Sequence, residues 1–81
     1  MRLEIITPEK KLYEGEVTLV RVPGSKGSFE VLKNHAPIIS TLESGTVRIV
    51  SDNKDDLFID IDGGVIEVQR NKIIVLADIS G

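Results

Sequence analysis

His35 is the only histidine in this chain of 81 residues and the side chain best suited to acid–base chemistry near neutral pH. As a catalytic base it would need an activated nucleophile, but the sequence contains no cysteine and no Gly-x-Ser-x-Gly motif. As a transition-metal ligand it would need at least two partners, and only carboxylates remain to supply them. We therefore interpret His35 as a structural or contact residue.

Five aspartates between residues 52 and 62 raise the question of a calcium site, because calcium takes several oxygen ligands at about 2.3–2.6 Å. Their spacing differs from that of an EF-hand loop, which places ligands at alternate positions and closes with a glutamate at the twelfth. Two of them share one face of a predicted strand, so we favour a solvated acidic edge over a metal site. The five are Asp52, Asp55, Asp56, Asp60 and Asp62.

The segment from residue 24 to residue 28 places two glycines around a Ser-Lys pair and superficially resembles a phosphate-binding loop. The Walker motif, however, has four residues between its glycines and a Lys-Ser or Lys-Thr pair at the start of a helix. Here a predicted strand follows instead. The segment is better explained as an exposed loop between strands, and nucleotide binding through it is not expected.

The elements that must carry these residues are predicted to be strands. Of the 33 apolar residues, 20 are Val or Ile, and β-branched side chains favour strands over helices. Short segments of alternating apolar and polar residues, separated by turn residues, delimit seven or eight strands, which is typical of a sandwich or small barrel. We therefore predict an all-β fold, a single small antiparallel β-sandwich of about eight to ten short strands over residues 1–81, without a helical domain.

Four local features are also predicted. Gly15 lies between two glutamates and indicates a bend or bulge within its strand. The turn at residues 52–55 connects two alternating segments as a hairpin, and Arg70-Asn71 is a two-residue hairpin connection. Residues 73–76 are apolar on both faces, which favours a central or doubly covered strand.

The charges argue against nucleic acid as a partner. Ten Lys and Arg oppose 13 Asp and Glu, giving a net charge of -3, and the basic residues are scattered along the chain. Binding to phosphate backbones requires a basic face. No apolar run approaches the ~18–20 residues needed to span a bilayer, and the first residues lack the apolar stretch of a signal peptide. We expect a soluble chain that stays in the cytoplasm.

Seven short motifs follow one another along nearly the whole chain: LEIITPE (3–9), YEGEV (13–17), VPGSKGSF (22–29), NHAP (34–37), GTVRI (45–49), GGVIEV (63–68) and VLAD (75–78). Each alone consists mostly of turn residues and β-branched residues. In this order and spacing they resemble the epsilon subunit of the F-type, proton-translocating ATP synthase.

The resemblance implies the amino-terminal β-sandwich of a non-catalytic rotor subunit. In that family the sandwich binds the gamma subunit and rests on the c-ring, so that rotation of the ring reaches the catalytic head. No cofactor is implied. The expected location is peripheral to the membrane through the complex, at the cytoplasmic face of the bacterial inner membrane.

The resemblance also assigns contact residues. Many members of the family carry an acidic residue where this chain has Ser28, and Glu30 lies two positions on, so a charge pair with the ring is expected to be shifted or lost. The expected c-ring contacts are Gly24, Ser25, Lys26, Gly27, Ser28 and the adjacent His35. The expected gamma contacts are His35, Ala36, Pro37, Ile38, Ile39, Ser40 and Thr41.

A second departure concerns the end of the chain. Many members of the family continue past the Ala-Asp motif into two helices that inhibit ATP hydrolysis and in some cases bind ATP. The chain given ends at Gly81, so neither helix-mediated inhibition nor ATP binding is expected of it. The alternative is an unrelated β-sandwich module that recognises another protein through its edge strands. An enzyme ranks third, because no convergent catalytic set is present.

Overall fold

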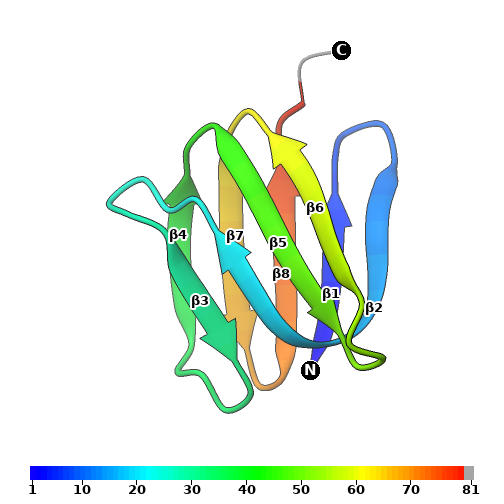
Figure 1. The fold of residues 1–81 in the computed structure, drawn as a ribbon. Coiled ribbons are helices and arrows are strands. Elements are labelled where there is room, and N and C mark those ends of the chain that lie inside the picture. Colours follow the sequence, from blue (N-terminus) through cyan, green and yellow to red (C-terminus); the bar gives the residue numbers. More distant parts are fainter. Residues whose placement is uncertain (80–81) are drawn as a thin grey trace.

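Eight β-strands and no helix make up the part of the chain that the computed structural model describes, residues 1–79 (Figure 1). The all-β prediction is confirmed. Residues 80 and 81, which the predicted domain includes, lie outside the described residues. No membrane-spanning helix occurs within residues 1–79. The strands are β1 (Arg2–Ile6), β2 (Lys11–Val22), β3 (Phe29–Leu32), β4 (Ile38–Leu42), β5 (Gly45–Ser51), β6 (Asp56–Ile61), β7 (Gly64–Gln69) and β8 (Lys72–Ala77).

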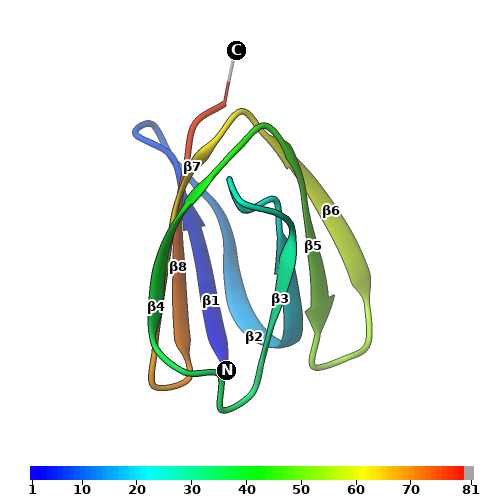
Figure 2. The same cartoon turned by 90° about the vertical axis from the view of Figure 1, so that its left-hand side faces the viewer.

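The strands form two layers that share β2. The first half of β2 pairs with β1, and its second half pairs with both β3 and β5. One layer therefore has the order β4-β7-β8-β1-β2, and the other is built from β3, β2, β5 and β6. Figure 2 shows the two layers from the side, with β2 between them. Sharing one long strand gives a curled sheet whose inner faces enclose the core.

The bulge predicted at Gly15 is not observed there. The pairing of β1 with β2 runs without interruption through Leu3 and Gly15. The register shifts instead near Leu12, where Ile5 pairs with Tyr13 and Ile6 with Lys11, and again between Val17 and Leu19. This is where β2 passes from one layer to the other. Gly15 has a different role, because a Cβ atom there would lie 3.2 Å from the hydroxyl oxygen of Tyr13. The glycine makes room for the tyrosine ring.

One strand pair is parallel. β1 and β8 run in the same direction, with Arg2 opposite Lys72 and Ile6 opposite Leu76, whereas every other pair of strands within residues 1–79 is antiparallel. The first and the last strands therefore lie side by side within the five-stranded layer.

The predicted turns are confirmed. Arg70 and Asn71 both have positive φ values, of 27° and 62°, as a tight two-residue hairpin connection requires. The turn at residues 52–55 connects β5 to β6, with Lys54 at a φ of 70°. β8 is central as predicted, between β7 and β1, but only one of its faces is covered, since Leu76 is 54% exposed.

The core is apolar and tightly packed. Alternate side chains of both layers point inward, and no polar side chain is buried within residues 1–79. With no cysteine in the sequence, apolar burial is the main source of stability. The buried side chains are Leu3, Ile5, Val17, Val20, Val22, Val31, Leu42, Val47, Ile49, Ile61, Ile66, Val68, Ile73, Val75 and Ala77.

Candidate functional site

The loop between β2 and β3 is anchored to the neighbouring layer. Gly24 forms an isolated bridge with Leu42, and the Ser25 amide donates a hydrogen bond to the Thr41 carbonyl at 3.0 Å. The Thr41 hydroxyl also donates to the Ser25 hydroxyl at 3.0 Å. The turn is closed by the Gly27 amide, which donates to the carbonyl of Gly24 at 2.9 Å. These bonds fix the loop against the end of β4.

Gly24 has a structural role within this loop. It is buried, and a Cβ atom at this position would lie 2.6 Å from the Gly27 carbonyl oxygen and 2.9 Å from the Phe29 ring. The other residues of the predicted contact segment, 25–28, are exposed. A partner can therefore reach those four residues, while Gly24 positions them.

His35 lies at the opposite end of β3 from this loop, so the expectation that the two are adjacent is wrong. β3 runs from Phe29 to Leu32 between them, and Figure 1 shows the two connections at opposite ends of the strand. The half-buried His35 donates from its amide to the Leu32 carbonyl at 3.1 Å. Its Nδ1 donates to the Ala36 carbonyl oxygen at 2.7 Å. These bonds fit a structural or contact role.

The segment from His35 to Thr41 presents only part of its side chains outward. Within β4, Ile38 and Ser40 are partly covered and Leu42 is buried, while Ile39 and Thr41 point outward. Ile39 is 71% exposed. A partner on this side would contact the outward residues of β4 and the exposed loop that precedes it.

The outer face of the five-stranded layer carries an apolar patch that the sequence did not single out. The register aligns Thr41, Val65, Leu76 and Ile6 in one row across β4, β7, β8 and β1, and Ile39, Glu67, Ile74 and Glu4 in the next row. Val65 and Leu76 are 36% and 54% exposed. We define the apolar patch as Ile6, Ile39, Val65, Ile74 and Leu76.

Beyond the apolar patch, the same face is charged. The Lys11 ammonium lies 3.1 Å from a carboxylate oxygen of Glu4 and 3.1 Å from one of Glu14, and Lys72 lies 3.6 Å from Glu4. Arg2 pairs with Glu14. The hydrogen bonds from Lys11 hold the pKa of both Glu4 and Glu14 below the usual value for a glutamate, and they raise the pKa of Lys11.

Acid should weaken the fold through this cluster. The carboxyls of Glu4 and Glu14 have lowered pKa values in the folded chain, so their contribution is present above the unfolded pKa and is lost as the pH falls below about 4. We expect the urea midpoint of the Lys11→Met variant to drop less between pH 7 and pH 3 than that of the wild type. Lys26→Met, in the exposed loop, is the matched control. An equal drop in all three proteins would contradict this prediction.

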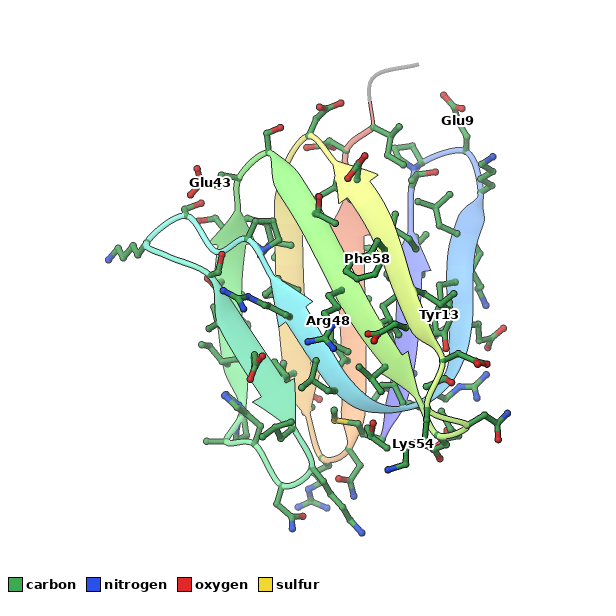
Figure 3. All side chains as sticks on the ribbon, in the orientation of Figure 1. Glu9, Tyr13, Glu43, Arg48, Lys54 and Phe58 are labelled. Atoms are coloured by element: carbon green, nitrogen blue, oxygen red, sulfur yellow. The ribbon has the colours of Figure 1, made fainter. Side chains whose placement is uncertain are left out.

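The aspartates of β6 are engaged by neighbouring side chains. Arg48 forms two hydrogen bonds with the Asp56 carboxylate, at 2.9 and 3.3 Å, and the Thr46 hydroxyl donates to Asp60 at 2.7 Å. Figure 3 shows Arg48 and the exposed Phe58 on the outer face of the layer built from β3, β2, β5 and β6. No group of three potential metal-binding side chains is found within residues 1–79. The solvated acidic edge remains the interpretation that fits these contacts.

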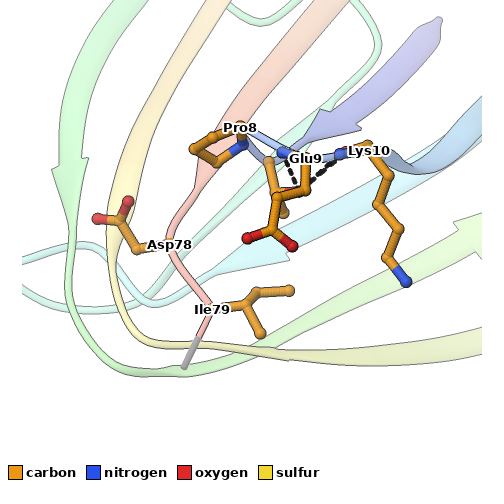
Figure 4. A pocket seen from close by; sticks show the side chains of 6 residues that line it. Pro8, Glu9, Lys10, Asp78 and Ile79 are labelled. Atoms are coloured by element: carbon orange, nitrogen blue, oxygen red, sulfur yellow. Dashed lines mark hydrogen bonds between the residues drawn. The ribbon is translucent and has the colours of Figure 1, made fainter. Parts of the chain in front are cut away.

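A small hollow lies at the β1–β2 turn (Figure 4). The Thr7 hydroxyl accepts hydrogen bonds from the amides of Glu9 and Lys10, at 3.3 and 3.1 Å, and donates to the Lys10 carbonyl. Asp78 and Ile79 complete its lining. The polar groups of the turn thus satisfy one another, and the hollow offers no convergent set of groups for a ligand.

Comparison with known proteins assigns the fold to a family. Residues 1–80 match the family described as ATP synthase, Delta/Epsilon chain, beta-sandwich domain. The chain belongs to this family. The ATP synthase epsilon chain of Chlorobium limicola is 46% identical over 78 residues, covering 95% of this chain and 88% of that protein. The epsilon chain of Chlorobaculum tepidum is 47% identical over 77 residues, covering 94% and 86%.

Solved structures support the fold of this Delta/Epsilon domain. A chain of the Euglena gracilis mitochondrial ATP synthase, in a structure of OSCP, F1 and c-ring, superposes with a TM-score of 0.87 at 16% identity. A chain of the Tetrahymena thermophila enzyme, from its central stalk and c-ring, gives 0.78 at 15%. The superposed region covers 93% and 96% of this chain, but only 48% and 63% of those longer chains.

Family membership has two consequences for the expectations from sequence. Relatives that share almost half of their residues with this chain are ATP synthase epsilon chains, which are non-catalytic subunits of the complex, and the enzyme interpretation is therefore set aside. The alternative of an unrelated β-sandwich module is also wrong.

Proposed function

We propose that this chain is a central-stalk rotor subunit of an F-type ATP synthase, which binds the gamma subunit and the c-ring and couples proton-driven rotation to ATP synthesis. The match of residues 1–80 to the Delta/Epsilon family carries the proposal. The names of the structural relatives, which include a c-ring and a central stalk, support it. Within the complex the chain would be peripheral to the membrane, at the cytoplasmic face of the bacterial inner membrane.

The fold suits a part that transmits force without chemistry. β2 belongs to both layers, and close-packed Val, Ile and Leu side chains join the layers across the core. A core at crystalline packing density has low compressibility, so a load applied to one layer is passed to the other.

Two sets of exposed residues support two partners. We assign the exposed residues 25–28 to the c-ring. We assign the exposed residues around His35, together with the outward side chains Ile39 and Thr41 of β4, to the gamma subunit. His35 lies at the opposite end of β3 from the loop, whereas Thr41 adjoins it through the hydrogen bonds to Ser25, so the two sets meet at the end of β4.

The direct test is calorimetric titration of the chain into a catalytic head that contains gamma but no epsilon subunit, with ATP hydrolysis followed in the same preparation. Binding with little inhibition is the expected result. A folded chain that does not bind would overturn the proposal, and strong inhibition would show that the sandwich regulates hydrolysis by itself.

The loop predicts a specific defect in assembly with the ring. Lys26→Glu reverses a charge on an exposed loop residue and should leave the fold intact, while weakening association with the c-ring by roughly 5- to 30-fold. Reconstitution of the complex and quantification of retained chain on a native gel would measure this. Lys54→Glu, in the exposed turn between β5 and β6, makes the same charge change elsewhere and should assemble normally. Wild-type assembly by Lys26→Glu would contradict the assignment of this loop.

A further inference from the structure

A carboxylate without a partner within residues 1–79 lies at the border of the apolar patch. Glu67 of β7 pairs in register with Ile39 on one side and with Ile74 on the other. Its side chain is half-buried, and no hydrogen bond or ion pair links it to another residue within 1–79. Together with the five residues of the apolar patch it lines a shallow hollow of about 380 Å³.

The other acids on this face are neutralised within the chain. Every outward glutamate of β1 and β2 has at least one cation within 4 Å. The exposed Arg70 of the β7–β8 turn lines a second hollow together with Glu67, but no ion pair joins the two within residues 1–79. Glu67 is thus an exception on its own surface. The pairs are Glu4 with Lys11 and Lys72, Glu14 with Lys11 and Arg2, and Glu16 with Arg2 and the amino terminus.

The apolar side chains and the carboxylate place opposite demands on a covering surface. Covering Ile39, Val65 and Leu76 removes apolar area from water and favours association. Covering Glu67 with apolar groups alone would strip water from an unpaired charge, which opposes association. A partner satisfies both demands only if it is apolar around one cationic side chain. Arginine suits this position best, because its guanidinium can bind a carboxylate through two hydrogen bonds.

We propose that the apolar patch is the centre of the docking surface for the gamma subunit, and that gamma inserts one arginine or lysine side chain among its residues to pair with Glu67. This inference rests on the proposed function for the identity of the partner. It extends the gamma contact from β4 across β7, β8 and β1.

The charge of Glu67 also argues against a second copy of this chain as the occupant. A symmetric dimer uses the same patch twice, so it would bring two Glu67 carboxylates into one interface, and none of the five residues of the apolar patch supplies a cation. Arg2, Lys11 and Lys72 are already engaged with Glu4, Glu14 and Glu16, and Arg70 lies in the turn at the edge of this face. Ile39 belongs both to the apolar patch and to the segment assigned to gamma, which makes the two contacts continuous.

Charge variants at Glu67 test the proposal. The affinity of the wild type, Glu67→Gln and Glu67→Lys for a catalytic head that contains gamma but no epsilon subunit would be measured by calorimetry. Both variants should bind at least about 30-fold more weakly, because each leaves the partner's cation buried and unpaired. Glu43→Lys, at the exposed β4–β5 turn, makes the same reversal of charge away from the patch and should bind within about twofold of the wild type.

Two further measurements protect the test from a folding artefact. The urea midpoint of Glu67→Gln should equal that of the wild type, because the carboxylate has no partner to lose within the described chain. In methyl NMR spectra of the wild type, the signals of Val65 and Leu76 should shift when the catalytic head is added.

Each outcome is decisive. If the wild type binds and the Glu67 variants bind equally well, or if Val65 and Leu76 do not shift, this inference is overturned while the proposed function stands. If Glu43→Lys is weakened as much as Glu67→Lys, general charge repulsion explains the effect and the inference is again overturned. If the folded wild type does not bind, the proposed function fails, and the inference fails with it.

Discussion

Replacing Gly64 with alanine is expected to prevent stable folding. Gly64 has a φ of 146°, and a Cβ atom there would lie far inside the contact distance of the Leu76 carbonyl oxygen and 3.1 Å from the Ala77 Cα. The backbone cannot move away, because Gly64 pairs with Leu42 of β4 on one side and with Ala77 of β8 on the other. We expect a loss of more than about 4 kcal/mol. A domain of this size has a total stability of about 4–12 kcal/mol.

Urea unfolding followed by circular dichroism would measure the effect of Gly64→Ala. Gly27→Ala separates the clash from the backbone strain, because Gly27 also has a positive φ, of 124°, but nothing lies within 4 Å of the added Cβ. That variant should lose only about 1 kcal/mol. A Gly64→Ala protein with nearly wild-type stability would show that β7 does not approach β8 in this register.

The second large effect is expected in the core. Ile66 is fully buried in β7, between Ser40 of β4 and Val75 of β8. Ile66→Ala removes buried methyl groups and leaves a cavity, at an expected cost of about 2–5 kcal/mol, whereas Ile66→Val should cost about 0.5–1.5 kcal/mol. Urea denaturation of both variants would give the two values.

Ile39→Ala is the matched control for the core. It makes the same chemical change in the adjacent strand, but Ile39 is 71% exposed and points to the opposite face. Its expected effect on the free energy of unfolding is within about 0.5 kcal/mol. Equal losses for Ile66→Ala and Ile39→Ala would contradict the assignment of inner and outer faces.

The local features of the fold were predictable because they depend on neighbouring residues. Alternation with a period of two marked the β5–β6 hairpin, and Arg70-Asn71 marked the turn that follows β7. The parallel pairing of β1 with β8 was not predictable in the same way, since it joins residues about 70 positions apart. The passage of β2 from one layer to the other near Val17 also depends on the strands with which each half of β2 pairs. No residue type near Val17 indicates it in the sequence.

The candidate site also has a part that local sequence predicts and a part that depends on how distant strands pair. The loop at residues 24–28 was found from its composition, but its separation from His35 depends on the length and direction of β3. The apolar patch was missed because its five residues come from four strands, and in the sequence they look like further core residues. One signal was available: Ile74 and Leu76 make β8 apolar on its second face, which only a partner or another layer would cover.

The pairing of the first strand with the last determines when this domain can form during synthesis. Until residues 72–77 have left the ribosome, β1 lacks its neighbour on one side, and β7 with β4 lacks any connection to the rest of the layer. Leu3 and Ile5 of β1 therefore lack the strand that covers them on that side until β8 has emerged, and the five-stranded layer can close only then. Because this pairing joins the two ends of the domain, the order of synthesis and the order of strand pairing differ: β1 is made first but is among the last strands to gain all its neighbours.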